Sequence, residues 1–305
     1  MNSKTAVSKK IFSVLFFLLI FASAGYAAPF DEIVVFGDSL SDNGNLLLIQ
    51  NQPKPDPAIY FEGRFSNGPV WVEYLADVAH FNVSLSDRAL GGAQSGGVIG
   101  LMTQIDGYIA TTGPSFSDSA LFVIWIGGND FFNGDGDFLS AVGNIKDALE
   151  RLVDFGARNF LVVNLPDLGL IPDELGSPEA PQATEFTLNF NADLANRLDI
   201  FRAAHPEVGL YEFDAYSLFT TVRNDPAAYG FTNVTDPSPN FDVPNNFDGA
   251  GYAFWDGKHP TTAMHAVMAD QVYADVNAQV PPPDTNTGNG NNNDNSTCFI
   301  GSSMN

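Results

Sequence analysis

Short apolar runs alternate with stretches of helical periodicity along most of the chain. Residues 33–36 and 121–126 are continuous apolar runs of strand length, which is typical of strands buried on both faces. Over residues 184–204, apolar side chains recur at helical spacing on one face, namely Phe186, Phe190, Leu194 and Leu198. This alternation predicts an α/β fold whose parallel sheet is covered by helices on both faces.

The rest of the chain comprises a long polar stretch and further predicted strands and helices. Residues 225–251 are rich in Asn, Asp, Pro and Gly and are predicted to form a long surface loop. The strands at 33–36 and 121–126 both end in turns of small and polar residues, where open α/β sheets bind their ligands. Further strands are predicted at residues 83–85, 159–165 and 208–213, and further helices at 70–78, 138–155 and 261–277.

The N-terminus has the pattern of a targeting segment. Three lysines lie within the first ten residues, residues 11–21 are almost wholly apolar, and a small-x-small motif ends at Ala27. These features predict a signal peptide over residues 1–27, cleaved after Ala27, and therefore a secreted or cell-surface protein. The alternative is an uncleaved membrane anchor, which the short apolar run and the early Pro29 disfavour.

Charge and cysteine usage narrow the function classes. The 305-residue chain has 13 Lys and Arg against 36 Asp and Glu, a net charge of −23, which argues against nucleic-acid binding. Cys298 is the only cysteine, so no disulfide can form within the chain. Residues 28–280 are expected to form one folded, monomeric domain.

The C-terminal residues 281–305 differ in composition from the rest. They are Pro-, Asn- and Gly-rich with little to bury, so a disordered tail is predicted. Within it, Cys298-Phe299-Ile300 follows an Asn-rich linker. This arrangement suggests attachment to the cell surface through the tail, and an exposed thiol without a role is the alternative.

Ser39 and His259 are the candidates for nucleophilic chemistry. Ser39 follows a predicted buried strand, although it could also cap the next helix. A serine hydroxyl needs a base within hydrogen-bond reach, and the base needs an orienting partner. His259 lies at an element boundary with Asp256 three residues before it, although a loop with a capping Thr explains this segment too. The other three histidines, His80, His205 and His265, are assigned to helix ends or helix packing.

An oxyanion requires preorganised hydrogen-bond donors. The backbone N–H groups of Ser39 and Gly92 and the side-chain amide of Asn129 form the available set. Residues 89–97 are too rich in glycine for a regular element, which suits either a flexible turn or close approach of the backbone to a ligand. Asn129, taken alone, could also be an ordinary turn residue.

Four blocks occur in a characteristic order. They are Gly37-Asp38-Ser39-Leu40, Gly91-Gly92-Ala93, Gly127-Gly128-Asn129-Asp130 and Asp256-Gly257-Lys258-His259-Pro260. Together they resemble the GDSL lipase/esterase family, also called SGNH hydrolases. Residues 36–45 and 63–72 resemble the bacterial and plant branch of this family, of which an exported bacterial member is expected here. The resemblance extends over residues 33–279.

The resemblance implies roles for individual residues. Ser39 would be the nucleophile, His259 the general base and Asp256 its orienter, with oxyanion donors at Ser39, Gly92 and Asn129. It also implies a flavodoxin-like three-layer α/β/α sandwich with about five parallel strands. Asp38 is then expected to hold the turn that presents Ser39, and Ser41 to act as a cap.

The implied activity is that of an exported serine esterase or lipase. It would hydrolyse small-molecule or lipid carboxylic esters through an acyl-serine and would use no cofactor. An acyltransferase, a carbohydrate acetylesterase and a non-catalytic binding module remain as alternatives. The elbow motif G-x-S-x-G and the dinucleotide motif G-x-G-x-x-G are both absent from the sequence.

One weak metal signal lies at residues 133–137. Asn133, Asp135 and Asp137 alternate in a Gly-rich segment, which suits the oxygen ligands of calcium. The glycine and the final glutamate of an EF-hand loop are missing. A helix-capping loop is therefore the favoured interpretation, and no metal site is predicted.

Overall fold

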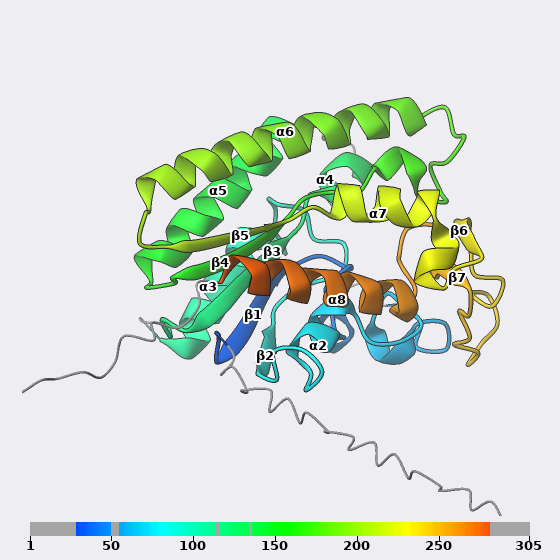
Figure 1. Ribbon diagram of the computed structural model, residues 1–305, viewed down its shortest axis with the longest axis horizontal. Helices are drawn as coiled ribbons and strands as arrows, with labels where there is room; N and C mark the ends of the chain where they lie inside the picture. Colours follow the sequence, from blue (N-terminus) through cyan, green and yellow to red (C-terminus); the bar gives the residue numbers. More distant parts are fainter. Residues whose placement is uncertain (1–28, 50–54, 114–115, 134–135, 281–305) are drawn as a thin grey trace, which may run out of the picture.

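The computed structural model describes residues 29–49, 55–113, 116–133 and 136–280 (Figure 1). The predicted signal peptide 1–27, the tail 281–305 with Cys298, and Asp135 all lie outside the described residues. Within the described ranges, no helix combines the length and the apolar character that crossing a membrane requires.

Five parallel strands form the central sheet in the order β2-β1-β3-β4-β5. Their carboxyl ends share one edge, since every neighbouring pair in this order is parallel. The central strand β3 is buried along its whole length, as its continuous apolar run predicts. The strands are β1 (Glu32–Gly37), β2 (Ser84–Asp87), β3 (Ala120–Trp125), β4 (Asn159–Val163) and β5 (Gly209–Phe213).

Helices cover both faces of this sheet. The helices α2 (Trp71–Ala76), α7 (Ala215–Asn224) and α8 (Thr262–Gln279) pack on the face that carries Ile33 and Val35. The helices α3 (Leu101–Thr112), α5 (Phe138–Asp154) and α6 (Ala180–Ala204) pack on the face that carries Val34 and Phe36 (Figure 1). The predicted three-layer α/β/α fold with five parallel strands is confirmed.

The prediction of a continuous loop over residues 225–251 is wrong. This segment contains a 3₁₀ turn, η3 (Pro226–Tyr229), and a strand, β6 (Asn233–Pro237). The strand β6 pairs with β7 (Tyr252–Phe254). The strand was missed because Asn233-Val234-Thr235-Asp236-Pro237 has one large apolar residue and no apolar alternation. Shorter elements complete the chain: α1 (Asn45–Leu48), η1 (Phe61–Gly63), α4 (Gly128–Phe132) and η2 (Leu168–Leu170).

Candidate active site

Ser39 lies in a tight turn directly after β1. The backbone N–H groups of Ser41 and Asp42 donate to the carbonyl of Asp38 at 3.1 and 3.0 Å. The Asp38 carboxylate accepts the N–H of Leu40 at 3.0 Å. Asp38 therefore holds the turn that presents Ser39, as expected. Burial raises the pKa of the Asp38 carboxyl to about 7, although the Leu40 N–H opposes this rise.

Gly37 allows β1 to end close against β3. A Cβ at this position would lie 2.5 Å from the carbonyl oxygen of Trp125, its neighbour in the sheet. Gln104 of α3 completes the end of the strand, because its Oε1 accepts the Gly37 N–H at 2.9 Å and its Nε2 donates to the Gly37 carbonyl at 2.8 Å. No sequence pattern indicated this buried side chain, since α3 itself was not predicted.

Ser41 has a different role from the predicted one. Helix α1 begins at Asn45 with Gly44 as its N-cap, so Ser41 caps no helix. Its hydroxyl is fully buried and accepts the indole N–H of Trp71 at 3.0 Å. The prediction failed because the turn continues for several residues beyond Ser41 before helix α1 begins.

His259 reaches Ser39 from the segment between β7 and α8. Its Nε2 lies 2.8 Å from the Ser39 Oγ, and its Nδ1 lies 2.6 Å from Oδ2 of Asp256. Thr261 begins α8 by accepting the Met264 N–H at 3.3 Å. Ser39 and His259 are 220 residues apart in sequence, so only folding brings the base to the hydroxyl.

Asp256 is a buried carboxylate with several donors. Its Oδ1 accepts the backbone N–H groups of Lys258 and His259 at 2.7 and 2.6 Å. Burial raises its pKa, but the electrostatic attraction of His259 and the hydrogen bonds from His259 and Tyr60 outweigh burial and lower it to about 2. Asp256 is therefore ionised at neutral pH and can orient the imidazole.

Sequence reasoning missed Tyr60. Its hydroxyl donates to Oδ2 of Asp256 at 2.7 Å, although the two residues are 196 positions apart. Burial and the charge of Asp256 raise the pKa of Tyr60, so the phenol stays a donor. The aromatic content of this loop was visible in the sequence, but the partner of the hydroxyl was not.

Asn129 lies next to the glycine-rich segment of residues 89–97. Asn129 belongs to the short helix α4 after β3, and its Nδ2 donates to the carbonyl of Ala93 at 3.0 Å. An amide nitrogen carries two N–H groups, so this contact leaves one donor of Asn129 for a ligand. The carboxylate of Asp130 ties the two segments further, since it accepts the N–H and hydroxyl of Ser95.

The two adjacent glycines are distinguishable in the structure. Gly91 donates its N–H to Oδ2 of Asp42 at 2.8 Å, and a Cβ there would meet the ring of Phe65. Gly92 has φ +77°, is exposed, and has open space where a Cβ would stand. These facts favour Gly92 over Gly91 as the N–H that faces a ligand.

An apolar cavity of about 50 Å³ opens beside Ser39 and His259. Ser39, His259 and Asn129 lie on its wall together with Lys258. The Lys258 ammonium pairs with Asp173 at 2.7 Å and lies 4.8 Å from the ring centre of Phe132. Most of the remaining wall is apolar, so the site suits a substrate with a hydrocarbon group.

The other histidines take structural positions. The prediction that His80 ends a helix is wrong, because α2 ends before this residue, at Ala76. The His80 side chain pairs with Asp270 at 2.8 Å. His205 caps the C-terminus of α6 and pairs with Glu150 at 2.9 Å. His265 is buried in α8, and burial lowers its pKa to about 3.

The segment near residue 137 begins a helix. The Asp137 side chain accepts the N–H groups of Leu139 and Ser140 and so caps α5. In the described ranges, no three His, Cys, Asp or Glu residues form a group that could hold a metal ion. The capping role predicted for this segment is thus seen at Asp137.

Known families and proteins resemble this chain over most of its length. The model of the GDSL-like Lipase/Acylhydrolase family matches residues 33–272. The thermolabile hemolysin of Vibrio parahaemolyticus is 31% identical over 271 residues, which cover 81% of this chain and 64% of the hemolysin. The chain thus spans less than two thirds of that relative.

Two further similarities are one to the sequence of an acyltransferase and one to the solved structure of an acetylesterase. The phosphatidylcholine-sterol acyltransferase of Aeromonas hydrophila is 26% identical over 82% of this chain and 91% of its own length. Among solved structures, Est24, a carbohydrate acetylesterase from Sinorhizobium meliloti, aligns with 82% of this chain and 100% of its own. The TM-score is 0.50 at 13% identity, so this likeness concerns the fold alone.

Proposed function

This chain belongs to the GDSL-like lipase/acylhydrolase family, and we propose that it hydrolyses carboxylic esters through an acyl-serine formed on Ser39. The observation that carries the proposal is the continuous hydrogen-bond path from the Ser39 hydroxyl through His259 to Asp256, at 2.8 and 2.6 Å. A serine hydroxyl becomes a competent nucleophile when such a base and orienter are in place.

Acylation begins at the Ser39 hydroxyl. His259 Nε2 accepts the hydroxyl proton as the oxygen attacks the ester carbonyl. Asp256, ionised and hydrogen-bonded to Nδ1, holds the tautomer in which Nε2 is free to accept that proton. The resulting imidazolium then gives its proton to the leaving alcohol, which leaves the acyl group on Ser39.

Three donors stabilise the tetrahedral oxyanion. We assign them to the N–H groups of Ser39 and Gly92 and to the free N–H of the Asn129 amide. The bond from Asn129 to the Ala93 carbonyl supports this assignment, since it fixes the amide before substrate binds. Hydrolysis of the acyl-serine follows by the same steps, with His259 activating a water in place of the serine hydroxyl.

The direct test is Ser39→Ala. The variant should fold and lose measurable turnover of p-nitrophenyl acetate, and it should no longer react with a fluorophosphonate probe. Ser119→Ala is the matched control, because Ser119 is exposed and precedes β3 at the opposite edge of the sheet. Full activity of Ser39→Ala would overturn the mechanism.

Acyl transfer to an alcohol is a second candidate. The similarity to a phosphatidylcholine-sterol acyltransferase supports it, since an acyl-serine can be attacked by an alcohol as well as by water. The products should be analysed with and without an added long-chain alcohol. A new ester formed at the expense of free acid would assign transferase activity, and free acid alone would assign hydrolysis.

We further propose that the protein is exported and acts as a monomer. The lysine-rich start and apolar run of residues 1–27 support export. The intact mass of secreted protein should correspond to a chain beginning at residue 28. A mass that ends before residue 305 would support processing of the tail at the cell surface, and size-exclusion with light scattering would report the oligomeric state.

A further inference from the structure

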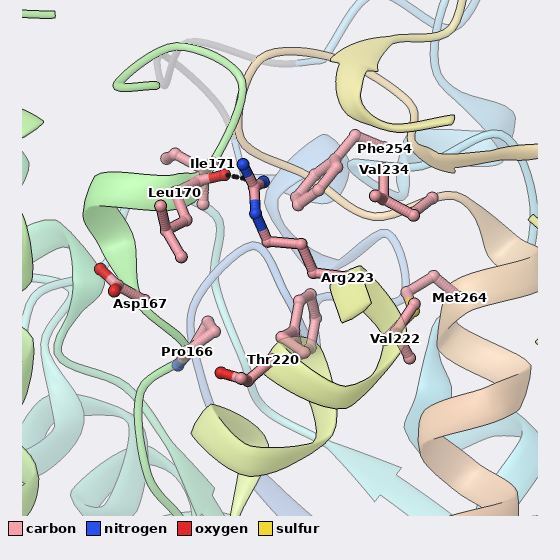
Figure 2. A pocket seen from close by; sticks show the side chains of 12 residues that line it. Pro166, Asp167, Leu170, Ile171, Thr220, Val222, Arg223, Val234, Phe254 and Met264 are labelled. Carbon is pink, nitrogen blue, oxygen red and sulfur yellow. Dashed lines mark hydrogen bonds between the residues drawn. The ribbon is translucent and has the colours of Figure 1, made fainter. Parts of the chain in front are cut away.

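A second cavity adjoins the one beside the nucleophile. It measures about 30 Å³ and lies between α7, the η2 segment and β6–β7 (Figure 2). Four residues line both cavities, namely Pro166, Ile171, Phe219 and Phe254. The two spaces are therefore neighbours across a shared wall, and the first of them contains Ser39 and His259.

Two aromatic rings stand at this junction. The ring centres of Phe219 and Phe254 are 6.4 Å apart, with an interplanar angle of 50°. Phe254 is buried in β7 and so is held by its surroundings. Phe219 comes from α7 and is only half-buried, so its ring is the part of the junction that can be shortened at the smaller structural cost.

Arg223 borders the second cavity on α7. Its Nη1 donates to the carbonyl of Leu170 at 3.5 Å. Figure 2 shows the side chain extended between Leu170 on one side and Phe254 with Val234 on the other. Its methylene stem thereby adds apolar surface to the wall, while the guanidinium stays at a polar contact.

We infer that the two cavities are consecutive compartments of one acyl-chain site, with Phe219 and Phe254 forming the constriction between them. This inference rests on the proposed esterase function. A cavity of about 10–15 Å³ holds roughly one water, so the first compartment accepts only a short acyl group. Longer chains must pass the two rings and occupy the second compartment.

The chemistry of the walls favours an acyl chain over the alcohol part of the ester. Leu165 and Leu168 line the first compartment, and Val222 and Met264 line the second. Glycerol and sugar hydroxyls lose free energy when they are buried without hydrogen-bond partners, whereas a hydrocarbon chain gains free energy in these surroundings. An acyl chain is therefore the substrate group that both compartments suit.

The test is the acyl-length profile of Phe219→Ala. The kcat/KM ratio of p-nitrophenyl octanoate to p-nitrophenyl acetate should rise about tenfold or more over the wild type, since each methylene accommodated in an apolar pocket contributes strongly to specificity. Tyr216→Ala removes an aromatic ring from the same helix outside both cavities, and its ratio should stay within about twofold of the wild type.

Filling the second compartment should reverse the gain. Val234 lines the second compartment and not the first. Adding Val234→Phe to Phe219→Ala should therefore return the ratio to near the wild-type value. Phe219→Leu serves if Phe219→Ala does not fold, and the same direction of change is expected.

Three results would overturn the inference. One is an unchanged octanoate-to-acetate ratio in both Phe219 variants. Another is a gain that survives Val234→Phe. The third is a gain seen only when the alcohol is lengthened, as from ethyl to hexyl acetate. In each case continued hydrolysis of p-nitrophenyl acetate would leave the proposed esterase function standing, whereas a wild type inactive on every ester would remove that function itself.

Discussion

The phenol of Tyr60 donates to the same carboxylate oxygen of Asp256 that faces Nδ1 of His259, at 2.7 and 2.6 Å. Oδ2 of Asp256 is thus shared between the base and a residue from a distant loop. Tyr60 packs against Phe65, and Phe65 in turn lies 5.1 Å from the imidazole, measured between ring centres. The loop therefore supports the base both through a hydrogen bond and through ring contacts.

Tyr60→Phe removes this hydrogen bond and keeps the ring contacts. A hydrogen bond to a charged group contributes about 1.5–3 kcal/mol, so we expect kcat to fall about tenfold and the pKa of Asp256 to rise. The measurement is steady-state hydrolysis of p-nitrophenyl acetate at neutral pH.

Tyr74→Phe is the matched control for that change. Its hydroxyl makes a hydrogen bond of the same 2.7 Å length, but to Thr262 at the start of α8. We expect a small loss of stability and unchanged kcat. Equal losses of activity in the two variants would mean that Tyr60 acts only through stability.

Asn129→Ala should lower kcat about 10²–10³-fold, with a much smaller change in KM, because an oxyanion donor acts mainly in the transition state. Asn159→Ala is a suitable comparison, since its Nδ2 also donates to a backbone carbonyl, that of Asp118, at 2.8 Å. Asn159 begins β4 and so lies away from the carboxyl edge of the sheet. A raised KM with unchanged kcat in Asn129→Ala would contradict the oxyanion role.

His265→Leu should raise stability most at mildly acidic pH. His265 is 1% exposed, and neither ring nitrogen has a hydrogen-bond partner among the described residues. Burial lowers its pKa from 6.5 to about 3, so between these values the unfolded chain binds a proton that the folded chain does not.

The stabilisation associated with neutral His265 is therefore present above pH 6.5 and is lost as pH falls towards 3. At pH 5 this linkage costs the wild type about 2 kcal/mol, which the leucine variant should recover. Urea unfolding at pH 7.5 and pH 5 measures the difference. A variant whose gain is the same at both pH values would show that the histidine does not titrate in this way.

Gly37→Ala should destabilise the protein by about 1–3 kcal/mol, because the added Cβ meets a backbone carbonyl that cannot move aside cheaply. The clash should also displace the end of β1, and with it Ser39, and so lower kcat. Gly107→Ala in α3 is the control, since nothing lies within 4 Å of its Cβ and alanine favours a helix interior by about 0.5–1 kcal/mol. Thermal unfolding and ester turnover of the two variants provide the comparison.

Local patterns predicted the elements whose burial is uniform. The run at residues 121–126 identified β3 because a strand covered on both faces needs apolar side chains throughout. Helix α3 escaped prediction because the polar Gln104 interrupts its buried apolar face and because Gly107 lowers the helix propensity of the segment. The buried amide of Gln104 is explained only by the end of β1, which is distant in sequence.

The sequence by itself determined the family, the layered fold and the candidates Ser39, Gly92, Asn129, Asp256 and His259, since particular residue types at strand ends form an ordered pattern that can be recognised without coordinates. The tertiary structure decided which atoms meet. Only packing brings His259 to 2.8 Å from Ser39 and Tyr60 to Asp256, and only packing places two rings between neighbouring cavities. Such contacts depend on how whole elements pack, and no local periodicity encodes a distance between residues some 200 positions apart.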